Sequence, residues 1–401
     1  MAAKLIKKIT IVFLLFCGVG AAYADVASVS QSRPVPIPMP ILTKPMANIP
    51  AAPDLAATAY ILVDANSGYV VAEKNADMRL PPASITKLMT LYIAASFLKA
   101  GQLHLTDPIT ISSAAWHMGG SRMFVNVGST VPLQEIIDGI VIASGNDASY
   151  ALAEHIGGTE DSFVGLMNQT ASALGMQNTH YANSNGLPAQ DHYSTARDIS
   201  KLASAWISDF PEYYPWFKQR WIAYQGIKQP NRNRLLWRDS SVDGIKTGHT
   251  DEAGYCLVSS AVRNGTRLIA VVMGTQSDEA RNNESEGLLN YGFRFYETHK
   301  LFDAGATLST PRIWFGKNKL AKLGVKNAMY VTIPIGQYQN LKASAVINDN
   351  LKAPISKGQV CGTLNILLSS KIVASSPLIA LEANPRENFI FSIYDHIAKL
   401  F

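Results

Sequence analysis

The alternation of apolar and polar residues between positions 54 and 297 predicts strands at both ends of a mostly helical stretch. The predicted strands cover residues 60–64, 69–73, 254–263 and 266–274. The predicted helices cover residues 85–99, 133–143, 148–155, 161–174, 196–207 and 284–296. Asn264 and Gly265 form a tight hairpin turn between the last two strands. Strands before and after a block of helices predict helices packed on an antiparallel sheet, an α/β/α sandwich of the α/β or α+β class.

The pattern changes after this stretch, and residues 298–383 predict a small second domain rich in β-structure. Short strands such as 328–333 and 362–368 alternate there with Gly and Pro turns.

Residues 384–401 predict a terminal amphipathic helix. Asn384 suits the N-cap and Pro385 the first helical position. One narrow face is polar, with Ser392, Asp395, His396 and Lys399, and the remaining positions are mostly apolar or aromatic. We expect this helix to lie in a membrane interface, and the alternative is that it packs back on its own domain.

The N-terminal residues have the features of a secretory signal peptide, which we assign to positions 1–24. Three lysines precede the apolar stretch 9–19, and Ala22 to Ala24 form a small-residue cleavage site. An uncleaved anchor is the alternative, although the apolar stretch is short for a bilayer. Residues 25–53 are rich in proline and predict an extended linker.

Composition and charge limit the possible partners. At 401 residues with 47% hydrophobic content, the chain is long enough for two cores, and its net charge of +5 is spread without an arginine-rich tract. We therefore expect no nucleic-acid partner. Cys256 and Cys361 fall in different predicted domains, so no disulfide is expected, and Cys256 is predicted to be a buried apolar residue. The histidines lack metal-ligand spacing, and we predict no metal ion and no cofactor.

Three short motifs carry the candidate chemistry. They are S-x-x-K at residues 84–87, S-x-N at 144–146 and K-T-G at 246–248. Ser84 follows two prolines and begins a predicted helix, so Lys87 lies on the same face and its amine can approach the Ser84 hydroxyl as a base. A second S-x-x-K, from Ser96 to Lys99, lacks this placement and is predicted to be helix interior.

The other two motifs suit the walls of a cleft. Gly145 is expected to permit a tight turn that directs its polar neighbours into the cleft. Lys246 is expected to begin an edge strand, with Gly248 letting a substrate backbone approach closely. Two lysines in one cleft would each lower the pKa of the other, which would help Lys87 to become neutral.

With their flanking residues, these motifs resemble one family. The stretches 84–89 (SITKLM), 144–148 (SGNDA) and 243–250 (DGIKTGHT) are similar to those of low-molecular-mass penicillin-binding proteins of the D-alanyl-D-alanine carboxypeptidase family. Residues 185–188 and 253–256 are also similar to stretches of that family. The resemblance extends from about residue 59 to the C-terminus. It implies a penicillin-binding-protein and β-lactamase-like sandwich with a catalytic domain at 54–297.

The resemblance also implies roles for individual residues. Ser84 would be the nucleophile, Lys87 its base, and Ser144 part of the proton relay to the leaving amine. Substrate-binding residues would be Asn146, Lys246, Thr247, Gly248, His249 and Arg232. Among these, Lys246 and Thr247 would hold the terminal carboxylate, and Arg232 would lie near it. The backbone N–H groups of Ser84 and His249 would form the oxyanion hole.

The function implied is that of an exported serine-type D-Ala-D-Ala carboxypeptidase. It would lie peripherally on the periplasmic face of the inner membrane, trim peptidoglycan pentapeptides ending in D-Ala-D-Ala, and be acylated by β-lactam antibiotics. Three alternatives stay open: a D,D-endopeptidase, a non-catalytic wall-binding protein and a serine β-lactamase. Residues 286–290 match the E-x-x-L-N letters of class A β-lactamases, but they follow K-T-G instead of preceding it.

Overall fold

The computed structural model describes residues 49–387, and these fall into two compact units, residues 50–298 and 299–387. The predicted signal peptide, most of the predicted linker and residues 388–401 of the predicted terminal helix lie outside the described residues. Within residues 49–387, no helix combines the length and the apolar character that crossing a bilayer requires.

The first unit is built on a five-stranded antiparallel sheet with the strand order β2-β1-β9-β8-β7. Its strands are β1 (Ala59–Asp64), β2 (Val70–Lys74), β7 (Val242–Thr250), β8 (Gly254–Arg263) and β9 (Thr266–Thr275). Alternate residues of β9 enter different cores: Ile269, Val271 and Met273 face one, and Leu268, Ala270 and Val272 face the other. Because both faces are buried, β9 is an almost continuous apolar run.

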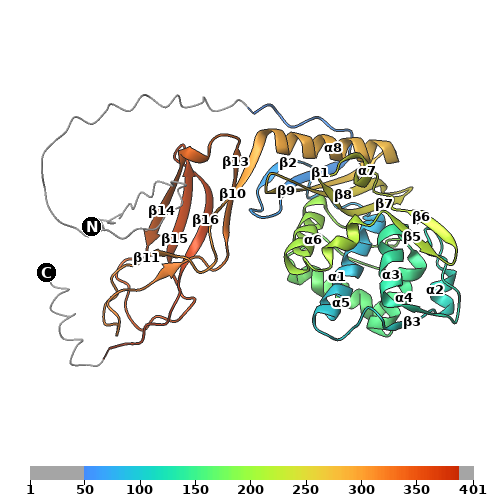
Figure 1. Cartoon of the computed structure of the whole chain (residues 1–401), viewed down its shortest axis with the longest axis horizontal. Helices are drawn as coiled ribbons and strands as arrows, with labels where there is room; N and C mark the ends of the chain where they lie inside the picture. Colours follow the sequence, from blue (N-terminus) through green and yellow to red (C-terminus); the bar gives the residue numbers. More distant parts are fainter. Residues whose placement is uncertain (1–48, 388–401) are drawn as a thin grey trace, which may run out of the picture. The chain divides into compact units, whose positions relative to one another are not determined.

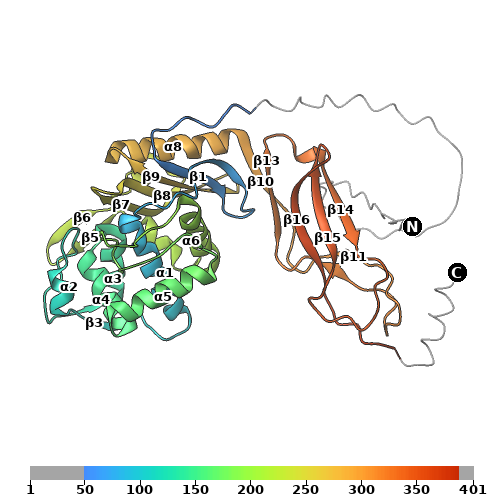
Figure 2. The same ribbon diagram turned by 180° about the vertical axis from the view of Figure 1, so that it is seen from behind.

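Helices cover both faces of this sheet. Leu288 and Leu289 of α8 pack on one face, and the larger core on the other face includes residues of α1, α4, α5 and α6 (Figures 1 and 2). The helices are α1 (Lys87–Lys99), α2 (Ser113–His117), α3 (Leu133–Asp138), α4 (Asn146–Gly157), α5 (Glu160–Ala173), α6 (Ala196–Asp209), α7 (Leu235–Arg238) and α8 (Asp278–Phe295). The predicted α/β/α sandwich with an antiparallel sheet is confirmed.

Short elements complete the unit. They are the 3-10 turns η1 (Ala83–Thr86) and η3 (Tyr214–Lys218), the π-helical turn η2 (Gly139–Ala143), the hairpin of β3 (Pro108–Thr110) with β4 (Thr130–Pro132), and the hairpin of β5 (Trp221–Tyr224) with β6 (Ile227–Pro230).

Three predicted helix boundaries are wrong. The helix placed at 85–99 begins at Lys87, because Ala83 has a φ of +47° and the chain first makes the tight turn η1. The helix placed at 133–143 is α-helical only to Asp138 and continues as η2. Helix α8 begins six residues before the predicted residue 284, because the Ser277 hydroxyl accepts a 3.0 Å hydrogen bond from the Ala280 N–H and caps it there.

The second unit is rich in β-structure, as predicted. A five-stranded antiparallel sheet has the order β11-β12-β16-β15-β14, and β10 pairs with β13. The strands are β10 (Tyr296–Phe302), β11 (Thr307–Ser309), β12 (Leu323–Gly324), β13 (Met329–Pro334), β14 (Leu341–Ile347), β15 (Val360–Leu368) and β16 (Lys371–Ala380), with the 3-10 turn η4 (Tyr338–Asn340) before β14.

The predicted start of a terminal helix at Asn384 is wrong. The Asn384 backbone instead forms a bridge with Ile355, donating at 2.8 Å and accepting at 3.0 Å. Its side chain bonds to the Asn318 backbone in both directions, at 2.8 and 3.1 Å. The amide that would cap a helix is therefore already paired, and the backbone is held in a bridge.

Candidate active site

The turn η1 and the start of α1 bring Ser84 and Lys87 together, as the S-x-x-K spacing predicts. The Lys87 Nζ lies 2.9 Å from the Ser84 Oγ. The second S-x-x-K is different, because the Ser96 hydroxyl donates to the Ile93 carbonyl at 2.6 Å and the Lys99 amine bonds to a backbone carbonyl at the surface. Only the first motif therefore places an amine against a serine hydroxyl.

The amine of Lys87 is completely buried and held by the protein. It donates to the Asn146 Oδ1 at 2.7 Å and to the Asn185 carbonyl oxygen. Burial is the largest cause that lowers the pKa of Lys87 well below its ordinary value, and the charge of Arg232 is the next. A neutral amine has two N–H bonds for these two acceptors and one lone pair for the Ser84 hydroxyl. The contacts therefore suit a general base.

Ser144 lies opposite, at the end of η2. Its hydroxyl accepts a 2.9 Å hydrogen bond from the Lys246 Nζ of β7. Lys246 is buried, and its pKa is lowered well below the ordinary value, first by burial and then by the charge of Lys87. The two lysines were expected to lower each other's pKa. Lys87 does lower the pKa of Lys246, but the cation that lowers the pKa of Lys87 is Arg232.

Gly145 serves a different purpose from the one predicted. The left-handed residue of this turn is Ser144, with a φ of +58°, while Gly145 has a φ of −60°. A Cβ on Gly145 would lie 2.8 Å from the Asp147 Oδ1 and 3.0 Å from the Met123 backbone nitrogen. Glycine is needed here for space and not for a positive φ.

Gly248 packs closely against the turn that carries Ser84. A Cβ at Gly248 would lie 3.0 Å from the Pro82 carbonyl oxygen and 3.2 Å from the Ile85 nitrogen. The glycine therefore lets β7 approach the turn that carries Ser84, and the close approach of a substrate backbone at Gly248 stays a prediction. The prediction that the strand begins at Lys246 is also wrong, because β7 begins at Val242. Its place at the edge of the sheet agrees with the prediction.

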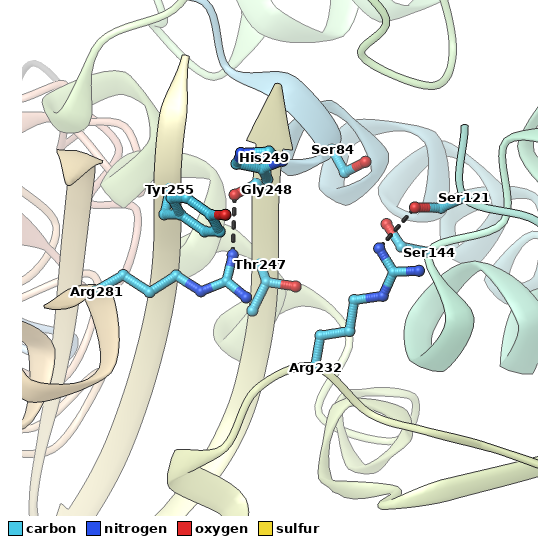
Figure 3. Close-up of a pocket in the computed structure, with 9 residues that line it drawn as sticks. All are labelled: Ser84, Ser121, Ser144, Arg232, Thr247, Gly248, His249, Tyr255 and Arg281. Atoms are coloured by element: carbon cyan, nitrogen blue, oxygen red, sulfur yellow. Dashed lines mark hydrogen bonds between the residues drawn. The ribbon is translucent and has the colours of Figure 1, made fainter. Parts of the chain in front are cut away.

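All of the predicted site residues converge on one region with two adjoining pockets. The first pocket is lined by Ser84, Ser121, Ser144, Arg232, Thr247, Gly248, His249, Tyr255 and Arg281 (Figure 3). The second is lined by Ser84, Gly120, Ser121, Asn146, Asn185, Gly186, Leu187, Arg232, His249 and Thr250. Lys87 and Lys246 lie beneath them, in contact with Ser84 and Ser144. Ser84 belongs to both pockets, so groups on either side of a scissile bond have separate spaces.

The first pocket is cationic. Arg232 donates to the Ser121 hydroxyl at 2.6 Å, and the guanidinium of Arg281 donates to the Gly248 carbonyl at 3.1 Å (Figure 3). Since Lys246 lies below the same space, the pocket is suited to an anionic group.

These observations agree with the family comparison. The sequence profile described as D-alanyl-D-alanine carboxypeptidase matches residues 46–277. The chain belongs to that peptidase family. A second profile, the C-terminal domain of penicillin-binding protein 5, matches residues 296–386 of the carboxypeptidase.

Individual relatives support the same assignment. The carboxypeptidase is 45% identical over 361 residues to D-alanyl-D-alanine carboxypeptidase DacA of Escherichia coli K12, covering 88% of this chain and 90% of that one. Penicillin-binding protein 5 of Haemophilus influenzae superimposes with a TM-score of 0.81 at 39% identity, over 84% of this chain and 99% of that one. Penicillin-binding protein 6B of E. coli gives a TM-score of 0.69 at 31% identity, over 84% and 98%. The protein is thus a serine-type D-Ala-D-Ala carboxypeptidase of the penicillin-binding protein class.

Sequence reasoning missed a buried carboxylate that anchors one wall of the carboxypeptidase site. Asp147 accepts hydrogen bonds from the backbone N–H groups of Met123 and Phe124, both at 2.8 Å, and of Val125 at 3.3 Å. The loop that it holds includes Ser121, whose backbone carbonyl accepts from the Asn146 N–H at 2.7 Å. Asp147 was visible as the neighbour of S-x-N, but nothing local shows which backbone groups it meets.

His192 was also missed, and it holds the turn that carries Ser84. Its Nδ1 accepts from the Ala182 N–H at 2.9 Å, so its Nε2 carries the proton and donates to the Thr86 hydroxyl at 2.8 Å. Burial lowers the pKa of His192 to about 4. His192 is therefore uncharged, and its two hydrogen bonds connect Ala182 to Thr86 of η1.

Residues 286–290, which match the E-x-x-L-N letters, line neither of the two pockets. Glu286 lies on α8, where its carboxylate is 4.0 Å from the Arg238 guanidinium, and it lines neither pocket. The carboxylate that would activate water in a class A β-lactamase is therefore not supplied by Glu286.

Proposed function

We propose that this carboxypeptidase removes the terminal D-alanine of peptidoglycan pentapeptides through an acyl ester on Ser84. The observation that carries the proposal is the completely buried Lys87 amine at 2.9 Å from the Ser84 hydroxyl. A buried amine with a lowered pKa is available as a base at neutral pH, whereas an exposed lysine is protonated.

Acylation begins when neutral Lys87 takes the proton of the Ser84 hydroxyl. The Ser84 Oγ then forms a bond with the carbonyl carbon of the penultimate D-alanine, and the carbonyl π electrons move to oxygen. The backbone N–H groups of Ser84 and His249 stabilise this oxyanion. The close packing of β7 on η1, which Gly248 permits, supports this pair because it places both backbone segments beside the nucleophile.

The tetrahedral intermediate collapses when the bond between carbon and the leaving nitrogen breaks. The proton taken by Lys87 reaches that nitrogen through the Ser144 hydroxyl, and free D-alanine leaves. Water then attacks the ester with Lys87 again as the base, which releases the shortened peptide and restores the Ser84 hydroxyl. The 2.9 Å contact with Lys246 supports the relay because it fixes the position of the Ser144 oxygen.

Substrate orientation follows from the two pockets. The terminal carboxylate lies in the cationic pocket, where Thr247 and Lys246 bind it and Arg232 closes the rim. The rest of the peptide lies in the second pocket, where the Asn146 side chain meets it. A β-lactam carries a cyclic amide and a carboxylate at a similar spacing, so it enters in the same orientation and acylates Ser84.

The reaction takes place outside the cytoplasm, on the periplasmic face of the inner membrane. This part of the proposal rests on the sequence: residues 1–24 direct export, and the apolar and aromatic residues of 388–401 hold the protein peripherally at the lipid surface. Deletion of 388–401 is expected to abolish sedimentation with lipid vesicles without changing the acylation rate. Unchanged sedimentation would reject the membrane role.

The nucleophile is tested by mass spectrometry of penicillin-treated protein. The wild type is expected to gain one adduct on the peptide that contains Ser84, and Ser84→Ala to gain none. Ser96→Ala, in the second S-x-x-K, is the matched control and should label fully. An adduct on Ser84→Ala would reject the assignment, and a wild type that releases no D-alanine from a pentapeptide would reject the function.

A further inference from the structure

The hairpin β5–β6 presents an aromatic surface beside the active site. In its register Trp221 faces Pro230, and Ala223 faces Lys228. Ile222 of the neighbouring position is buried in the main core, so Trp221, Ala223 and Lys228 lie on the outward face of the hairpin. The hairpin therefore packs on the core through its inner face, and Trp221 lies on its outer face.

Two tryptophans form this surface. Trp221 is 49% exposed and Trp237, on the short helix α7, is 40% exposed. Their ring centroids are 5.9 Å apart with an interplanar angle of 81°. Adjacent exposed tryptophans are unusual on a protein surface because each leaves a large apolar area in water, and such patches mark interaction sites.

Cations hold the two rings in place. The Lys228 Nζ lies 4.7 Å from the centroid of Trp221, and the Arg220 guanidinium lies 5.8 Å from that of Trp237. Among residues 49–387, neither cation has a carboxylate within ion-pair distance, and Arg220 also donates to the Leu236 carbonyl. The surface is thus preorganised and offers hydrogen-bond donors beside apolar ring faces.

The same chain segment leads directly into the substrate site. Two residues after β6 comes Arg232, which closes the rim of both pockets. The Gln229 side chain donates to the Arg122 carbonyl at 3.2 Å, next to Ser121 of the pocket wall. Gln229 pairs with Ile222 on the inner face, so the hairpin packs with that face on the loop that forms one wall of the pockets, and the tryptophan face is directed away from this loop.

We propose that Trp221 and Trp237 bind the N-acetylated sugar rings of the peptidoglycan strand that carries the stem peptide. This inference rests on the proposed function and names a further part of its substrate. A pyranose ring presents axial C–H groups to an aromatic face and hydroxyl and acetamido groups at its rim, which match the ring faces and the donors of Lys228 and Arg220. A lipid surface suits the hairpin less well, because its tip residue Gln225 is polar and accepts a 3.1 Å hydrogen bond from Asn126.

The test compares two substrates on the full-length mature enzyme: the free pentapeptide and the same pentapeptide attached to its disaccharide. The wild type is expected to have a higher kcat/KM for the disaccharide form by about tenfold, which corresponds to ~1.4 kcal/mol. The double variant Trp221→Ala, Trp237→Ala should lose this preference and keep the wild-type rate on the free peptide. Met78→Ala is the control, because Met78 is an exposed apolar residue of the same unit at 48% and should keep the preference.

A direct binding measurement accompanies the kinetics. Titration with a soluble oligomer of N-acetylglucosamine should quench the tryptophan fluorescence of the wild type and of Ser84→Ala. The fluorescence of the double variant should not change. Equal rates on the two substrates, or a preference that survives in the double variant, would overturn the inference. Loss of vesicle binding by the double variant, with the sugar preference intact, would identify a lipid contact and reject the sugar site. If the proposed function fails, the free pentapeptide is not cleaved at all, an outcome that is distinguishable from these.

Discussion

Gly186→Ala tests whether the position of η1, the turn that carries Ser84, limits catalysis. Gly186 has a φ of +86°, and a Cβ built on it lies 1.9 Å from the Ala83 carbonyl oxygen and 3.0 Å from the Ser84 nitrogen. Both contacts are with backbone, so no side chain can rotate away. The Gly186 loop and the turn η1 must therefore separate for an alanine to fit.

The size of the effect follows from that distance. Nonbonded carbon and oxygen atoms need about 3.2 Å or more, so the loop and the turn must move apart by roughly 1 Å, and a misplacement of that size costs on the order of 10²-fold in rate. The positive φ adds about 1–2 kcal/mol of backbone strain, which lowers the free energy of unfolding. We therefore expect acylation by a fluorescent penicillin to slow about 100-fold, while the protein stays folded.

The control for this variant separates steric displacement from backbone strain. Gly158 has a φ of +76° with open space around its Cβ position, so Gly158→Ala has the strain without the clash. Stopped-flow acylation rates and thermal unfolding of both variants give the comparison. If Gly186→Ala is acylated within about threefold of Gly158→Ala, the geometry of η1 does not control the reaction and the reasoning is refuted.

Three further predictions concern charge. Asp147→Asn should slow acylation, because an amide NH₂ group replaces one carboxylate oxygen and faces backbone N–H groups. The acylation rate is expected to rise with pH as Lys87 loses its proton, and this variant should move that rise to lower pH, because Asp147 raises the pKa of Lys87; an unchanged profile would contradict this. Lys87 and Lys246 have lowered pKa values in the folded state, so the unfolded chain binds more protons and the free energy of unfolding should rise with pH up to about 10. Urea unfolding at about pH 7 and 9 measures this rise, which should be smaller in Lys87→Met. A free energy of unfolding that does not change with pH would contradict the prediction. Glu286→Gln should leave the lifetime of the penicillin adduct unchanged, because Glu286 pairs with Arg238 outside the pockets; a changed lifetime would revive a role in deacylation.

Element types were predictable where the signal is local. The strand β9 and the turn at Asn264 and Gly265 depend on neighbours within a few residues, and the structure agrees with the prediction there. The start of α8 was misplaced because its cap, Ser277, lies outside the apolar pattern that the prediction followed. The expected helix at Asn384 failed for another reason: pairing with Ile355, far away in the chain, determined the backbone.

The chemical residues of the site were predictable as a set, since Ser84, Lys87, Ser144 and Lys246 belong to motifs with recognisable letters. The contact between Lys87 and Ser84 follows from their spacing, but the other contacts in the site do not. The residues that surround them, Arg281 in particular, belong to no local motif in the sequence analysis. Arg281 enters the site because α8 packs on β8 and β9 and its guanidinium reaches the Gly248 carbonyl of β7.

The sequence by itself determined which groups can react, because hydroxyl and amine side chains are properties of single residues. The tertiary structure decided what state those groups are in. Burial of Lys87 removes the water that would keep its amine protonated, and Gly248 and Gly186 matter through backbone atoms distant in the chain. Desolvation and steric contact depend on all neighbours in space, so they exist only once the chain has folded.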